Sequence, residues 1–133
     1  MPPSFLHQYE IFYQKAIADL TLVKEVLSIE NSKIERGILL FHLQQAAEKF
    51  LKSLLSYRGI HFGKVHDIEK ILDIFVAHEV TVPHYTKKFI ELTPYAVEGR
   101  YDFITDENID IRRFVTLIED FKHFVDVQIG LSS

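Results

Sequence analysis

The sequence IERGILLFHLQQAAEKFLKSLLSY, from Ile34 to Tyr57, decides the fold. Its apolar side chains recur at intervals of three and four residues, at Ile38, Phe41, Ala47, Phe50, Leu51, Leu54 and Leu55. This spacing is typical of a long amphipathic α-helix, because about 3.6 residues complete each turn. Glu48, Lys49 and Lys52 take the opposite side, where we expect solvent. We predict that this helix lies at the centre of the fold.

The middle of this helix is small and polar on one side, at Gln44, Gln45, Ala46 and Ala47. Small residues there would let another backbone approach closely and bury the side-chain amides, which would then need hydrogen-bond partners. The alternative is that both glutamines are solvated surface residues, since glutamine is also a good helix former. The residues alone favour the second interpretation.

Helical periodicity continues on both sides of this segment. We predict further helices from about Phe5 to Ser28, from His66 or Asp67 to His78, and from about Asn108 to Ile129. A shorter helix begins at Pro83 and runs to about Leu92, because proline suits the first turn. Residues 95–106 indicate a loop with room for one helical turn. Ser32 and Glu35 predict a capping box before the central helix, and the chain is expected to be all-α.

Composition limits the classes of protein to which the chain can belong. A length of 133 residues, 47% of them hydrophobic, suits one domain with a sizeable core, so we assign residues 1–133 to a single domain. The absence of cysteine excludes disulfides and thiolate metal sites. No stretch has the length of a membrane span and no secretory signal begins the chain, so we expect a cytoplasmic protein without a membrane segment.

Charge and histidine spacing exclude further classes of site. The net charge is −4 and the basic residues are scattered, whereas non-specific nucleic-acid binding normally requires a basic surface. Seven histidines raise the question of a metal, but none occurs in a recognised ligand spacing. We therefore expect no metal and no cofactor.

Three segments in this order resemble the HEPN family of small helical bundles. They are HLQQAAEKFLKSLLSYRGI at residues 42–60, KVHDIEKIL at 64–72 and GRYDF at 99–103, followed by a terminal amphipathic helix. The resemblance implies an up-and-down bundle of four or five helices that commonly dimerises. It also implies a link to nucleotides, because members are often paired with a minimal nucleotidyltransferase, and some are metal-independent ribonucleases or toxins.

The ribonuclease branch of that family is marked by an arginine and, a few residues later, a histidine near the start of the last long helix. Arg100 matches the arginine, but the corresponding positions 105–107 hold Thr, Asp and Glu. We therefore favour a nucleotide-associated or interaction module that acts with a separate nucleotidyltransferase in a toxin-antitoxin-like pair. The alternative is a ribonuclease in which Arg100, the best catalytic candidate, works with another base such as His42 or His66.

Arg36 and His42 have the spacing of that motif but lie in the wrong place. Six positions along a helix turn the side chains about 120° apart, so the two would not converge unaided. We treat their spacing as a coincidence.

Candidate ligand-binding residues lie on the central helix, just after it and around Arg100. They are Gln45, Lys49, Lys64, His66, Asp67, Arg100 and Tyr101. A phosphate could bind the free backbone N–H groups of a helix that starts at His66. The alternative is that Asp67 caps this helix while His66 bonds the central helix through Gln45. Arg100 either binds a phosphate or carboxylate in a bidentate manner or forms a stabilising salt bridge.

The first predicted helix has apolar residues on more than one face. Tyr9, Phe12 and Tyr13 stand beside Ile11, so a single stripe cannot account for all of them. A second apolar face indicates a second surface to bury. We predict a homodimer.

Overall fold

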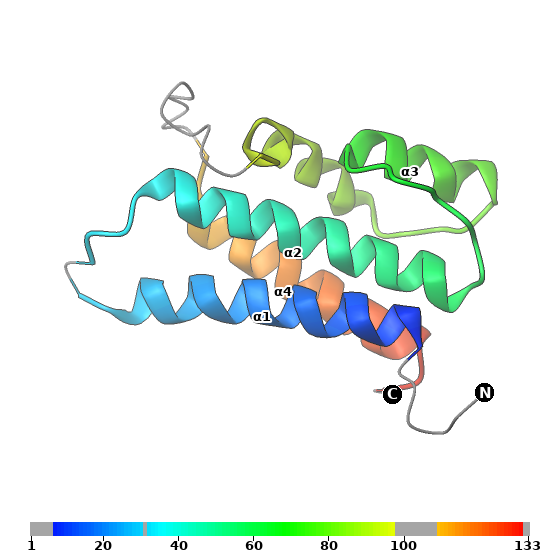
Figure 1. Cartoon of the computed structure of the whole chain (residues 1–133), viewed down its shortest axis with the longest axis horizontal. Helices are drawn as coiled ribbons and strands as arrows, with labels where there is room; N and C mark the ends of the chain where they lie inside the picture. Colours follow the sequence, from blue (N-terminus) through cyan, green and yellow to red (C-terminus); the bar gives the residue numbers. More distant parts are fainter. Residues whose placement is uncertain (1–6, 31, 98–108, 132–133) are drawn as a thin grey trace.

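The computed structural model describes residues 7–30, 32–97 and 109–131. Its elements are α1 (Gln8–Ser28), α2 (Arg36–Tyr57), α3 (Ile68–Ala77), the 3-10 helix η1 (His84–Tyr95) and α4 (Ile111–Gln128). α1 and α2 form an antiparallel hairpin with α4 packed behind it, while α3 and η1 lie along the other side of α2 (Figure 1). The predicted all-α helical bundle is confirmed.

The core of the bundle surrounds α2, which contacts each of the other four helices. Leu43, Ala47 and Phe50 are completely buried on this helix, whereas α1 buries only a narrow stripe. The short side chains of Ala46 and Ala47 lie in the middle of α2 and are both inaccessible to solvent. The prediction that this helix lies at the centre is therefore confirmed.

The start of α2 differs from the prediction. Residues 32–35 are not helical, and Glu35 is the N-cap of the helix that begins at Arg36. Ser32 is therefore too early in the chain to form the predicted capping box. Its hydroxyl instead accepts a hydrogen bond from the backbone N–H of Ile34 at 3.3 Å.

The fourth element is a 3-10 helix, whereas the sequence suggested a shorter segment that ended near Leu92. Its buried residues are Thr86, Phe89, Leu92 and Tyr95, each three positions after the one before. A 3-10 helix has three residues per turn, so this spacing places all four side chains on one line facing the core. Pro83 precedes the helix as its N-cap, and Pro94 lies inside it. The interval of three explains why an unusually long 3-10 segment persists here.

Tyr85 on η1 is expected to make the stability of the fold depend on pH in the alkaline range. Burial, followed by the nearby Asp120 carboxylate, raises the pKa of Tyr85 to about 12. The folded state therefore favours the neutral phenol. This preference contributes fully to the free energy of unfolding below the ordinary pKa of about 10. The contribution is lost as the pH rises from about 10 to about 12. We expect Tyr85→Phe to remove this component. Urea unfolding across that pH window checks the difference, and parallel curves for the two proteins would contradict it.

The end of α3 stores backbone strain at Glu79. This is the only non-glycine residue with positive φ, 56°, in the described part of the chain. The turn is closed by the N–H of Val80, which donates to the carbonyl of Phe75 at 2.9 Å, a geometry that favours glycine at the position before it. We expect Glu79→Gly to stabilise the fold by about 1 kcal/mol. Thermal unfolding provides the measurement, and Glu79→Ala, which keeps a Cβ, should show no such gain.

Candidate functional site

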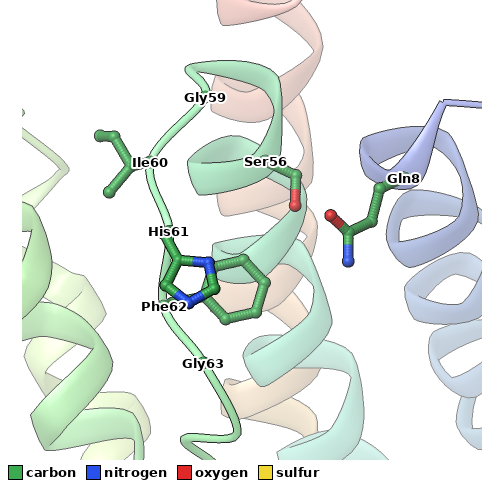
Figure 2. Close-up of a pocket in the computed structure, with 7 residues that line it drawn as sticks. All are labelled: Gln8, Ser56, Gly59, Ile60, His61, Phe62 and Gly63. Carbon is green, nitrogen blue, oxygen red and sulfur yellow. The ribbon is translucent and has the colours of Figure 1, made fainter.

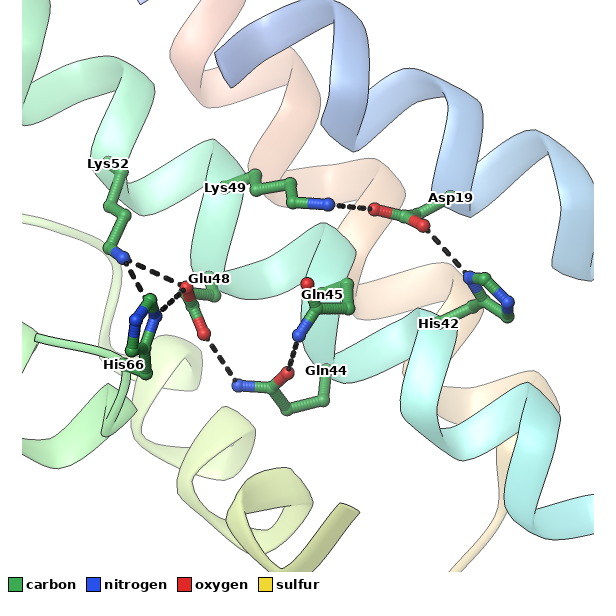
Figure 3. A network of polar contacts seen from close by, with 8 residues as sticks. All are labelled: Asp19, His42, Gln44, Gln45, Glu48, Lys49, Lys52 and His66. Carbon is green, nitrogen blue, oxygen red and sulfur yellow. Dashed lines mark hydrogen bonds and ion pairs between the residues drawn. The ribbon is translucent and has the colours of Figure 1, made fainter. Parts of the chain in front are cut away.

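A network of charged and amide side chains lies along one side of α2 (Figure 3). Glu48 and Lys52 are each only 4% exposed, and the Lys52 ammonium donates to Glu48 Oε2 at 2.9 Å. The expectation that these two side chains face solvent is wrong, because Phe62 and His66, in the loop that follows α2, contact them on that side. A buried ion pair carries a large desolvation cost, which is offset only where the remaining polar atoms are also bonded.

The glutamines supply part of that bonding. Gln44 is completely buried and its amide donates to Glu48 Oε1 at 3.0 Å. Gln45, which is partly buried, donates in turn to the Gln44 carbonyl oxygen at 2.7 Å. The buried interpretation of this part of α2 is thus correct, and the two amides form a chain that ends on the Glu48 carboxylate.

His66 brings the network to the surface. Its side chain is 70% exposed, yet Nδ1 lies 3.0 Å from Glu48 Oε2 and 3.3 Å from Lys52 Nζ. The contact to the Glu48 carboxylate, an acceptor, places a proton on Nδ1, and Nε2 has no hydrogen-bond partner among the residues that the structure describes. The predicted bond from His66 to the central helix is confirmed, with Glu48 as its partner instead of Gln45.

Asp67 caps the following helix, as one of the two alternatives predicted. Its Oδ1 accepts a hydrogen bond from the N–H of Glu69 at 2.9 Å. The carboxylates of Asp67 and Glu69 both lie at the N-terminal turn of α3. Their negative charges oppose the binding of a phosphate there. Lys64 is exposed and has no hydrogen-bond or ion-pair partner within the described ranges.

A second polar cluster joins α1 to α2 (Figure 3). Asp19 lies 2.9 Å from His42 Nδ1 through Oδ1, and accepts from the Lys49 ammonium at 2.9 Å through Oδ2. Lys49, predicted to face solvent and to bind a ligand, is thus part of a helix–helix contact with 21% of its side chain exposed. Arg36 donates to the carbonyl of Ile109, so Arg36 and His42 contact different partners.

The other predicted ligand-binding residues are in the segment that follows η1. Arg100 and Tyr101 lie outside the described residues. Within the described ranges, no group of three or more histidine, aspartate or glutamate side chains is arranged to hold a metal. Of the helices in the described part of the chain, none is long and apolar enough to cross a bilayer.

The contacts that sequence reasoning missed are those made by Glu48, Lys52 and Asp19. A Glu–Lys pair four residues apart is ordinarily a solvated feature of a helix surface. Their burial could have been predicted from the sequence, because apolar residues precede and follow both Glu48 and Lys52 in a helix that was expected to be central. Asp19 offered no comparable signal, because its partners are distant in the sequence.

The chain was also compared with known proteins. The model of the HEPN domain family matches residues 9–128. The searches of curated proteins and of solved structures gave no match. The family match runs from the second residue of α1 to the last residue of α4, and so includes the whole network around Glu48 and His66. On this basis the chain belongs to the HEPN domain family.

Proposed function

We propose that this HEPN domain, formed by residues 1–133, is the nucleotide-associated and partner-binding half of a cytoplasmic, toxin-antitoxin-like pair. The other half is a separate minimal nucleotidyltransferase. Membership of the family supports the pairing, and the absence of a histidine at positions 105–107 weighs against ribonuclease activity. The exposed His66 imidazole, held by buried charges, carries the proposal.

The chemistry of His66 suits a nucleotide phosphate or a carboxylate of the partner. Glu48 and Lys52 neutralise one another, so a protonated imidazole adds one positive charge at the surface. Because Glu48 fixes Nδ1, the imidazole presents Nε2 to solvent in a defined direction, and a charged N–H···O bond there is stronger than a neutral one. Lys64, close by in the sequence, is free to add a second cation.

The pairing is tested by affinity capture of the tagged chain from its native cell at modest salt. We expect a small nucleotidyltransferase in stoichiometric amount, identified by mass spectrometry. His66→Ala is expected to weaken that capture, whereas His78→Ala, which alters an exposed histidine at the end of α3, should not. Capture of no stoichiometric protein by the wild type would overturn the proposal.

A homodimer is part of the same proposal, and the outer face of α1 suits it. Ile11 and Leu22 are 41% and 38% exposed and lie about 20° apart around the helix. Lys15 and Ala18 are exposed between them on the same face, and Lys15 forms no ion pair within the described ranges. The order of these four residues along α1 is self-complementary. In an antiparallel second copy of α1, Ile11 would pack against Leu22, and the apolar stem of Lys15 would cover the small Ala18. A twofold interface requires such matching of one surface with itself.

Charge placed at Ala18 tests this interface. We expect light scattering to show a wild-type dimer, and Ala18→Lys to weaken it because each new ammonium would face Lys15 of the second copy. Ala18→Glu, a change of similar size and opposite charge, should preserve dimerisation because its carboxylate would face the same lysine. A monomeric wild type, or a dimer indifferent to the sign of the charge, would remove α1 from the interface.

Ribonuclease activity is the second candidate, and one observation favours it. A carboxylate that holds Nδ1 and leaves Nε2 free is the usual arrangement of a histidine general base. In that case His66 would take the 2′-hydroxyl proton and Arg100 would stabilise the charge on phosphorus. RNA cleavage in EDTA should then fall about 100-fold or more in His66→Ala and Arg100→Ala. An inert wild type would exclude this candidate.

A further inference from the structure

A cavity of about 250 Å³ lies between the first turn of α1 and the loop that follows α2 (Figure 2). It is lined by Gln8 of α1, Ser56 in the last turn of α2 and loop residues 59–63. Gly59 and Gly63, with φ of 71° and 62°, allow the chain to turn at each end of this loop. The volume is slightly below the range of drug-sized sites, so the cavity suits a single ring system.

One buried polar group of this cavity has no partner among the residues that the structure describes. Ser56 Oγ is buried and has no hydrogen-bond partner among the residues that the structure describes, although buried hydroxyls are almost always bonded. The Ser56 hydroxyl and the Gln8 amide point toward one another from α2 and α1, while Ile60 points away (Figure 2). Both groups can donate and accept hydrogen bonds. The cavity therefore presents a hydroxyl and an amide that a ligand could satisfy.

An aromatic side chain completes the cavity. Phe62 is half-buried, with its ring held edge-on to Phe12 at 5.7 Å between centroids. The Lys52 ammonium lies 5.5 Å from the centre of the Phe62 ring, and the same ammonium contacts Glu48 and His66. The cavity is therefore adjacent to the polar network of α2.

We propose that this cavity binds one unpaired nucleobase, with its ring against Phe62 and its polar edge bonded to Ser56 and Gln8. A base is planar and uncharged, and it carries donors and acceptors side by side on one edge. The described residues that line the cavity include no aspartate, glutamate, lysine or arginine, and the one imidazole, His61, is itself a flat ring that can pack against a base. The inference rests on the proposed nucleotide association, and the Lys52 ammonium, which lies near both the Phe62 ring and His66, connects the two sites.

The probes are adenosine, ribose 5-phosphate and a short single-stranded RNA, each titrated into the purified full chain. We expect adenosine and RNA to give saturable shifts in the amide resonances of residues 56–63. Ribose 5-phosphate, which lacks a base, should not shift them. Tighter binding of RNA than of adenosine would assign the base to RNA, and the reverse would assign it to a free nucleotide. No saturable shift with either base-containing probe would overturn the proposal.

Two variants separate binding from folding. Ser56→Ala should lower the affinity about fivefold while the thermal midpoint stays unchanged or rises, because its hydroxyl has no partner to lose. Gln8→Ala alters an exposed residue and should weaken binding similarly, whereas Gln14→Ala, an exposed amide on the same helix outside this cavity, should not. Wild-type affinity in both Ser56→Ala and Gln8→Ala would refute the assignment.

The same variants distinguish this inference from the proposed pairing. Ser56→Ala and Gln8→Ala should still capture the nucleotidyltransferase in stoichiometric amount. If the wild type captures the partner but binds no adenosine or RNA, the base site alone is wrong. If it binds the base through Ser56 and Gln8 but captures no partner, the base site stands and the pairing fails.

Discussion

Replacing Lys52 with methionine is expected to lower the free energy of unfolding by about 3–5 kcal/mol. Methionine preserves much of the apolar stem of the lysine but removes the ammonium that lies 2.9 Å from Glu48. The Glu48 side chain, 5% exposed, would then keep its charge in the interior without its nearest counter-ion. Urea denaturation followed by circular dichroism measures the loss.

Two variants establish that the loss comes from an unpaired buried charge. The double variant Glu48→Gln/Lys52→Met removes both charges and keeps an amide that can bond Gln44, so most of the stability should return. Lys24→Met breaks the exposed ion pair with Glu119, whose side chains are 51% and 41% accessible, and should cost no more than about 1 kcal/mol. If Lys52→Met were no worse than Lys24→Met, the buried pair would have no special role.

Phe121→Ala is expected to cost about 3–5 kcal/mol, because truncation of a fully buried phenylalanine leaves a cavity that neighbours fill only in part. Phe121 is 0% exposed on α4. Its ring centroid lies 5.9 Å from that of Phe89 on η1 and 5.8 Å from that of Phe124, so the same change also removes two aromatic contacts.

A matched truncation on the same helix provides the comparison for Phe121→Ala. Val127 is 41% exposed, and its replacement by alanine should change the free energy of unfolding by less than about 1 kcal/mol. Both variants should still unfold in one cooperative transition, with the same dependence of the free energy of unfolding on urea concentration as the wild type. A Phe121→Ala loss as small as that of Val127→Ala would mean that η1 does not depend on α4 for its position.

Periodicity was sufficient to predict the helices and most of the core. Phe114, Ile118, Phe121 and Val125 recur at helical spacing within the helix predicted from about Asn108 to Ile129, and each is at least nine-tenths buried. Such patterns succeed because the burial of apolar area decides which face of a helix turns inward. The 3-10 character of η1 was missed because its buried residues follow a period of three, which a search for helical spacing near 3.6 does not find.

The polar network could be predicted only in part. Asp67 as a cap and His66 as a contact of α2 follow from local order, since both stand at the start of a helix. The partnership of His66 with Glu48 depends on packing between segments 18 residues apart, and no local rule specifies it. Burial of Glu48 and Lys52 arises because α2 is covered on several sides, whereas an amphipathic pattern assumes one solvated face.

The position of α4 has a consequence for biosynthesis. α4 packs against both members of the α1–α2 hairpin, yet it is the last of the described helices to leave the ribosome (Figure 1). At ordinary translation speeds, the delay between completion of α2 and of α4 is on the order of ten seconds. Throughout that delay, Leu43 and Phe50 belong to a nascent chain whose apolar surface is incompletely covered, and such surface is the kind that chaperones bind during translation.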